Sequence, residues 1–153
     1  MRRITYIIII LCLSLSAYAQ KKDIAQAREF VKKGNNLPKA EQLMSNLLKD
    51  SVNRRNDKIW LTLFDAQKKQ YEQGNEKLYL KQQYDTASLF ASAKKMFQTL
   101  EGLDSVDALP DDKGKVKLKY RKKHAALLNV YRRNLYNGGI YFVRHNKYEE
   151  AYG

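Results

Sequence analysis

Apolar residues recur at intervals of three and four along most of the chain, and this spacing is the feature that most limits the fold. The clearest stretch follows a proline-containing helix start, Asn36-Leu37-Pro38, and has five apolar residues on one stripe: Ala40, Leu43, Met44, Leu47 and Leu48. Such a stripe must be buried against a partner. Two prolines and seven glycines in 153 residues also argue against a turn-rich β fold. The sequence therefore predicts an all-α protein.

Two neighbouring segments repeat this helical spacing. Residues 23–33 predict a short helix that ends at Gly34, because glycine readily takes the positive φ of a helix C-terminus. A third helix is expected from Asp57, which can cap it, to Gly74-Asn75, which we expect to end or kink it. Its mostly apolar face consists of Trp60, Leu63, Phe64, Gln67 and Tyr71.

A fourth helix is expected from Tyr84 to about Leu100, with Phe90, Ala93, Phe97 and Leu100 at spacings of three or four. Residues 101–114 then contain Pro110 and Gly114 and predict a long connector. Its acids invite a calcium hypothesis, but the ligand pattern of an EF-hand loop is missing, so a solvated loop is favoured. These acids are Asp104, Asp107, Asp111 and Asp112.

Residues 113–123 are strongly basic: seven of the eleven are Lys or Arg. Lys117, Lys119 and Arg121 alternate with apolar neighbours as in a strand, whereas the later Leu128, Tyr131 and Leu135 extend a helical period. A helix is favoured because no partner strand is evident. A solvated helix face is the simplest interpretation of this charge, and adhesion to an anionic surface is the alternative.

The first nineteen residues have the features of a cleavable signal peptide. Arg2 and Arg3 precede an apolar stretch from Ile4 to Leu15, and Ala17-Tyr18-Ala19 offers small residues at the recognition positions, so cleavage is expected after Ala19. A retained membrane anchor is the alternative, but the stretch is shorter than the roughly 20 residues that span a bilayer. Lipidation of Cys12 is the minority interpretation, because no small residue precedes it. The protein is therefore expected in the periplasm or at the cell surface.

Export changes what the charge implies. Loss of Arg2 and Arg3 lowers the net charge from +13 to +11, and loss of Cys12 removes the only cysteine. A mature chain of 134 residues (153 minus 19) fits one domain, spanning 20–153. Nucleic acid would be the first partner considered for a basic cytosolic protein, but none is expected for an exported one. An acidic protein or an anionic envelope surface fits better.

The C-terminal segment carries a spaced pattern of small and aromatic residues: Leu135, Gly138-Gly139, Phe142, Tyr148 and Ala151. It resembles the tetratricopeptide repeat (TPR), in which leucine, glycine, an aromatic residue and a later alanine follow one another. Leu135, Gly139, Phe142 and Ala151 occupy those places, and residues 146–148 supply the turn. Gly138 stands where leucine is usual and suggests slight under-packing. Tyr84 and Ala87 repeat the Tyr148 and Ala151 spacing, while Leu37 and Ala40 do so more faintly.

Together with the signal peptide, this resemblance points to an exported TPR protein of Gram-negative bacteria. It implies antiparallel helix hairpins stacked as an α-solenoid, with a last repeat that starts at about residue 132 and is incomplete at Gly153, so that the chain is expected to be the N-terminal part of a longer array. A plain helical bundle is the alternative. The resemblance also implies a concave groove for a peptide or partner helix, to which the last repeat would contribute Arg133, Tyr136, Asn137, Ile140 and Arg144. These side chains could equally face solvent or another helix.

No pattern of catalytic or cofactor-binding residues is evident in the sequence. His124 and His145 have no carboxylate or cysteine at ligand spacing and are expected on helix surfaces, so neither a metal nor a cofactor is expected. Neither a nucleophile elbow nor a phosphate-binding loop is present. The favoured function is a non-enzymatic protein-binding scaffold, ahead of a cationic module that adheres to anionic envelope polymer or lipid, and ahead of an unrecognised enzyme.

Overall fold

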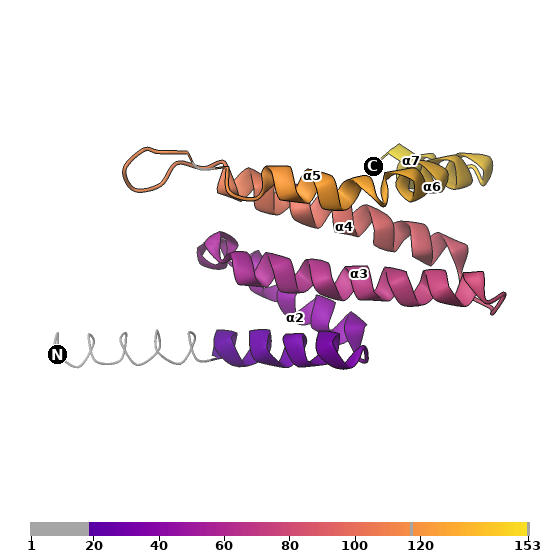
Figure 1. Ribbon diagram of the computed structural model, residues 1–153, viewed down its shortest axis with the longest axis horizontal. Helices are drawn as coiled ribbons and strands as arrows, with labels where there is room; N and C mark the ends of the chain where they lie inside the picture. The colour runs from indigo at the N-terminus through magenta and orange to yellow at the C-terminus, as the bar shows by residue number, and fades with distance from the viewer. Residues whose placement is uncertain (1–18, 117, 153) are drawn as a thin grey trace.

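The computed structural model describes residues 19–116 and 118–152, and every secondary-structure element in these ranges is helical. The elements are a helical segment over residues 19–33, α2 (Leu37–Lys49), a 3-10 turn η1 (Ser51–Arg55), α3 (Asp57–Tyr79), α4 (Thr86–Asp107), α5 (Arg121–Asn129), α6 (Arg132–Arg144) and α7 (Tyr148–Tyr152). They pack largely as adjacent antiparallel pairs, and α6 also packs on α4 (Figure 1). The predicted all-α class is confirmed.

The signal peptide falls almost wholly outside the described residues, as do Ala17, Cys12, Lys117 and Gly153. Ala19 is exposed and already helical, so helical structure is present four residues before the expected start at Asp23. The side chain of Gln20 donates to Asn53 Oδ1 over 2.7 Å and ties this segment to η1.

The predicted helix end at Gly34 is confirmed. Gly34 has a φ of +67°, and its N–H donates to the Val31 carbonyl while the Asn35 N–H donates to the Phe30 carbonyl. This is the Schellman arrangement, which satisfies carbonyls that the helix leaves unpaired. The chain can therefore turn sharply and start α2 only three residues later.

The predicted stripe on α2 builds the first half of the core. Ala40 and Met44 are fully buried, and Leu43, Leu47 and Leu48 are partly buried beside them. Ala27, Ala40 and Ala66 have no exposed surface, which lets three helices approach closely where larger side chains would hold them apart. The other buried members of this cluster are Ile24, Ile59 and Leu63.

α3 differs from the prediction at both ends. Asn56, one residue before Asp57, caps the helix by accepting the Lys58 N–H, and the helix continues through Gly74-Asn75 to Tyr79. A Cβ on Gly74 would lie 2.5 Å from Tyr84 Cζ. Gly74 therefore admits the Tyr84 ring against the backbone of α3, and the helix does not end there.

α4 is longer than predicted, and the predicted connector is correspondingly wrong. Asp85 caps the helix by accepting the N–H groups of Ala87 and Ser88, and the helix ends at Asp107 instead of Leu100. Leu103 is buried, and Gly102 packs against the Trp60 ring, where a Cβ would lie 2.7 Å from Cζ3. Residues 101–107 thus contribute to the core, because burial of Leu100 and Leu103 continues the helical face.

The basic run is not one helix. Among its described residues, 113–116 and 118–120 lie in the connector between α4 and α5, and only residues from Arg121 onward are helical. Asp107 at the end of α4 accepts the N–H groups of Lys119 and Tyr120 over 2.5 and 3.3 Å. These bonds take backbone donors that a helix would have used, so the helical interpretation is wrong for residues 113–116 and 118–120.

His124 is not a surface residue. It is 3% exposed, its Nδ1 lies 2.6 Å from Asp104 Oδ1, and the Tyr120 ring stacks on it with 5.4 Å between ring centroids. The carboxylate partner is 20 residues away in sequence, on α4. This contact joins α5 to α4. His145, in contrast, is exposed at the end of α6, as predicted.

The second half of the core lies between α3, α4 and α5, and comprises Phe64, Tyr71, Leu89, Ala93, Met96, Leu100 and Leu128. Beside this cluster the Thr99 hydroxyl donates to Gln67 Oε1 over 2.8 Å. Among the described residues, this is the only hydrogen bond between two side chains that is fully buried. The Tyr71 ring also meets Tyr131 edge-on, at 5.4 Å between centroids. Tyr131 immediately precedes α6, so this contact helps to place the C-terminal hairpin.

Candidate functional site

The C-terminal hairpin of α6 and α7 is formed by a tight turn. Asn146 has a φ of +57°, and the Lys147 N–H donates to the Phe142 carbonyl over 2.9 Å while the Asn146 N–H donates to that of Val143. This is again a Schellman end, with asparagine at the left-handed position. The predicted turn at residues 146–148 is therefore displaced slightly, because Tyr148 is already the first residue of α7.

The hairpin packs on α4 through a glycine and aromatic side chains, and the Tyr141 ring lies 5.4 Å from the Phe90 ring between centroids. Gly138 is buried, and a Cβ built on it would lie 2.9 Å from Phe90 Cβ. Phe142, one turn later, is 7% exposed. The close approach of α6 to α4 thus requires glycine at 138. The expectation that glycine leaves this position under-packed is wrong.

A hollow of about 610 Å³ lies along α6 and α7, and we call it the α6–α7 groove. Its lining residues are Arg132, Leu135, Tyr136, Gly139, Ile140, Val143 and Arg144 from α6 with Ala151 and Tyr152 from α7. The α6 members follow the spacing of one helical stripe, and arginine stands at each end of it. Between the arginines the lining is mostly apolar.

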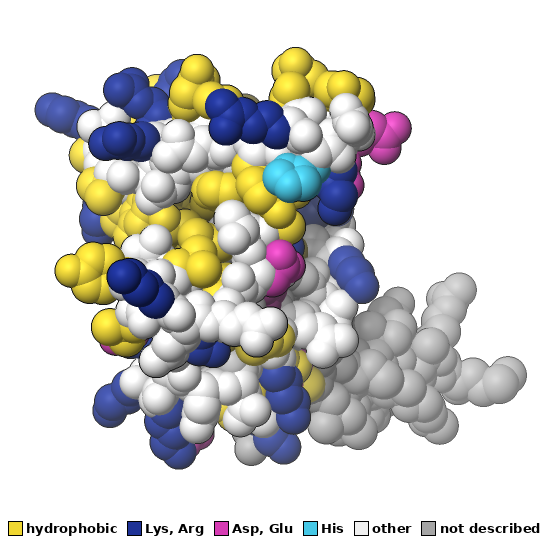
Figure 2. Space-filling model, turned by 90° about the vertical axis from the view of Figure 1, so that its right-hand side faces the viewer, with side chains coloured by type: hydrophobic (Ala, Val, Ile, Leu, Met, Phe, Trp, Pro, Cys, Tyr) yellow, Lys and Arg dark blue, Asp and Glu magenta, His cyan; other side chains and the backbone are white. Residues whose placement is uncertain are grey.

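Large apolar side chains of this groove are open to solvent. Tyr136 is 69% exposed and Tyr152 is 82% exposed. Figure 2 shows the end of the molecule that carries α6 and α7 at the upper right of Figure 1. Hydrophobic side chains gather on this face and along its upper edge, with Lys and Arg around them. Because contiguous exposed apolar surface on soluble proteins often marks an interaction site, the groove is the candidate functional site.

The structure brings together some of the predicted binding residues and separates others. Tyr136, Ile140 and Arg144 line the groove, whereas Arg133 and Asn137 are exposed on α6 but do not line it. Arg132, Val143 and Tyr152 were not among the predicted binding residues. The signal for Arg132 and Val143 was present in the sequence, because they continue the three-and-four spacing from Tyr136 and Ile140.

The residues predicted to pack the repeat have different environments. A Cβ on Gly139 would lie 3.8 Å from the Ala151 carbonyl oxygen, so these two small residues do face each other across the hairpin. Leu135 is half-buried, and Tyr148 is 53% exposed. Of the earlier pair, Tyr84 packs on Gly74, and Ala87 is half-buried in the first turn of α4.

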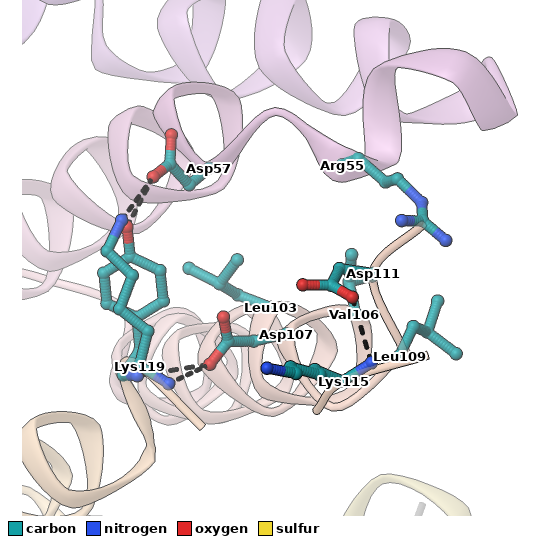
Figure 3. A pocket seen from close by; sticks show the side chains of 10 residues that line it. Arg55, Asp57, Leu103, Val106, Asp107, Leu109, Asp111, Lys115 and Lys119 are labelled. Atoms are coloured by element: carbon teal, nitrogen blue, oxygen red, sulfur yellow. Dashed lines mark hydrogen bonds and ion pairs between the residues drawn. The ribbon is translucent and has the colours of Figure 1, made fainter. Parts of the chain in front are cut away.

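A second hollow, of about 370 Å³, lies between the start of α3, the end of α4 and the connector (Figure 3). The Tyr120 hydroxyl donates to Asp57 Oδ2, and Lys119 Nζ lies 3.4 Å from the same oxygen. These two partners, Tyr120 first, hold the pKa of the Asp57 carboxyl below its ordinary value. Asp57 therefore stays ionised at neutral pH and holds the connector in place.

Three of the four acids predicted in the connector accept hydrogen bonds within the structure, and the fourth, Asp112, is exposed. Asp104 and Asp107 belong to α4 and bind His124 and the connector backbone, and Asp111 accepts the N–H groups of Lys113 and Lys115 over 2.9 Å each. The interpretation of these acids as a solvated loop is wrong for Asp104 and Asp107. Over residues 19–116 and 118–152, no three His, Cys, Asp or Glu side chains come together in a way that could hold a metal ion.

Within the described part of the chain, no helix combines the length and the apolar character needed to cross a membrane. Comparison of the chain with protein-family models, with curated protein sequences and with solved structures found no match.

Proposed function

We propose that this chain is a non-enzymatic protein-binding scaffold that acts outside the cytoplasm and binds its partner in the α6–α7 groove. The observation that carries the proposal is the apolar stripe between Arg132 and Arg144, with Tyr136 and Tyr152 exposed beside it. Exposed tyrosine and arginine at the edge of an apolar hollow are the side chains that contribute most to protein interfaces.

The proposed scaffold is a set of TPR-like hairpins. Support comes from the antiparallel pairing of successive helices and from small residues where helices meet, such as Gly139 facing Ala151. In repeat proteins each hairpin buries one face against its neighbour and leaves another surface for ligands. Export, which the first nineteen residues predict, would place this surface in the periplasm or on the cell surface.

Replacing Tyr136 by aspartate should abolish capture of a partner by the α6–α7 groove. The chain is crosslinked to a cell-envelope fraction and purified together with any protein bound to it. The unaltered chain should capture a protein that the Tyr136→Asp variant does not, because a carboxylate in the apolar stripe cannot be buried without loss of hydration. Tyr79→Asp is the matched control: Tyr79 is 84% exposed at the end of α3, outside the groove, and the charge change is the same. Thermal melting should show both variants folded. Equal capture by all three chains would refute the groove as the binding site.

The exposed basic connector favours a second candidate function, adhesion to an anionic envelope polymer or lipid. Lys113 and Lys115 are exposed, and Lys119, although paired with Asp57, is 63% exposed at its side chain. The capture experiment separates the two functions when it is repeated at about 1 M salt, where the Debye length is about 3 Å. Binding through the apolar groove should persist, whereas charge-driven adhesion should be lost.

A further inference from the structure

The α6–α7 groove has a definite length and a definite charge pattern. Its α6 stripe runs from Arg132 to Arg144, which is twelve residue steps. At 1.5 Å per step, the two arginine Cα atoms lie about 18 Å apart, a distance that a partner helix of about three turns would match. Among the residues that the structure describes, Arg132 and Arg144 are the only charged ones that line the groove. Both ends are therefore positive and the middle is apolar.

From this pattern we infer that the groove takes an amphipathic helix whose apolar stripe is flanked at both ends by carboxylates. This inference rests on the proposed function and names the chemistry of the partner. Apolar side chains spaced by three and four on the partner would fill the hollow between Ile140, Val143 and Tyr152. Its terminal carboxylates would pair with Arg132 and Arg144, whose guanidinium groups suit carboxylates geometrically.

Gly139 makes the centre of the groove deep enough for a partner side chain. A Cβ built there meets only the Ala151 carbonyl oxygen, at 3.8 Å, and Ala151 itself has a small side chain. Both residues line the groove. A large apolar residue of the partner, such as leucine or phenylalanine, can therefore reach the backbone of α6 and be buried between the two helices.

The charge pattern disfavours a second copy of this chain as the occupant. In a two-fold symmetric pair the same stripe lies on both sides of the interface. If two α6 helices pack antiparallel, Arg132 of each copy faces Arg144 of the other, so like charges meet at both ends. The net charge of the full chain is +13 and would be +11 after loss of Arg2 and Arg3, and either value adds further repulsion between copies.

Two synthetic peptides of about 15 residues, a length at which isolated helices are marginally stable, test the inference. Both carry the same leucine stripe, and one has glutamates and the other lysines at both ends. Fluorescence anisotropy should show that the unaltered chain binds the glutamate peptide about tenfold more tightly, since two favourable ion pairs replace two repulsive contacts. The double variant Arg132→Glu, Arg144→Glu should reverse this preference.

A control separates the groove from the charge of the whole molecule. Lys21→Glu, Lys22→Glu also changes the net charge by −4, at exposed positions of the segment 19–33, which lies on the opposite side of the molecule from α6 (Figure 1). This variant should keep the preference for the glutamate peptide. If it loses the preference as fully as the arginine variant does, or if the unaltered chain binds neither peptide, the inference is overturned.

The remaining outcomes distinguish this inference from the proposed function. If neither peptide binds but Tyr136 still governs capture of an envelope protein, the groove is a binding site for a different chemistry and only the inference fails. If sedimentation shows a dimer that Tyr136→Asp dissociates, the groove binds a second copy, and the inference is again wrong. If neither the peptides nor an envelope protein depends on Tyr136, both proposals fail.

Discussion

Replacing Gly138 by leucine is expected to lower the free energy of unfolding by about 3 kcal/mol, at the upper end of the usual effect of overpacking a core. Even a methyl group at this position would lie 2.9 Å from Phe90 Cβ, an atom close to the backbone of α4 that cannot swing away. The larger side chain must push α6 off α4. Urea denaturation of the two chains, followed by circular dichroism, measures the difference.

The adjacent glycine provides the control. Gly139→Ala places its Cβ at an ordinary contact distance of 3.8 Å from the Ala151 carbonyl oxygen. Because alanine favours a helix over glycine by roughly 1 kcal/mol, this variant should be as stable as the unaltered chain or more so. Gly138→Leu should therefore lower the free energy of unfolding, whereas Gly139→Ala should leave it unchanged or raise it. A Gly138→Leu chain of unchanged stability would show that α6 does not pack on α4 as described.

Replacing His124 by alanine is expected to lower the free energy of unfolding by about 3 kcal/mol, as the loss of one partner from a buried charged or polar pair does. The change removes the partner that lies 2.6 Å from Asp104 and leaves a space beneath the Tyr120 ring. The Asp104 side chain is 23% exposed, so water can reach it only in part. α5 then loses a principal contact with α4.

His145 offers a matched control for this prediction, because it is exposed. Its Nδ1 lies 2.8 Å from the Tyr141 carbonyl oxygen, and its ring lies against the Tyr141 ring. His145→Ala should change the unfolding free energy by no more than about 0.5 kcal/mol, as is usual for surface substitutions. Thermal or urea denaturation of both variants gives the comparison. Equal effects of the two changes would mean that the contact between His124 and Asp104 contributes nothing beyond an ordinary surface interaction.

The sequence predicted those parts of the fold that depend on local spacing. The stripe through Ala40 and Met44 and the turn at Gly34 were both confirmed, because one helix face and one backbone conformation decide them. The roles of Gly74 and Gly102 could not be predicted from local spacing. The sequence pattern predicted a break at Gly74 and assigned no packing role to Gly102, yet each glycine admits an aromatic ring, that of Tyr84 and that of Trp60 respectively. Only the tertiary contact explains them.

His124 and the acids of the predicted connector were misjudged for the same reason. The partner of His124 is 20 residues away, and Asp107 binds the backbone 12 and 13 residues further along. No local spacing rule links such positions, since the pairing depends on how α5 folds back on α4. At the groove, Tyr136, Ile140 and Arg144 were predicted. Tyr152 was not, because its place beside α6 depends on the hairpin turn.

Hydrogen exchange of the chain, alone and bound to the envelope protein that it captures, tests the central claim most directly. Amide exchange reports local opening, and a bound partner slows it where the partner covers the chain. The proposal predicts slower exchange over residues 132–152, with the connector residues 108–120 unchanged. Slower exchange in the connector alone, with residues 132–152 unaffected, would contradict the proposal and assign binding to the basic surface instead.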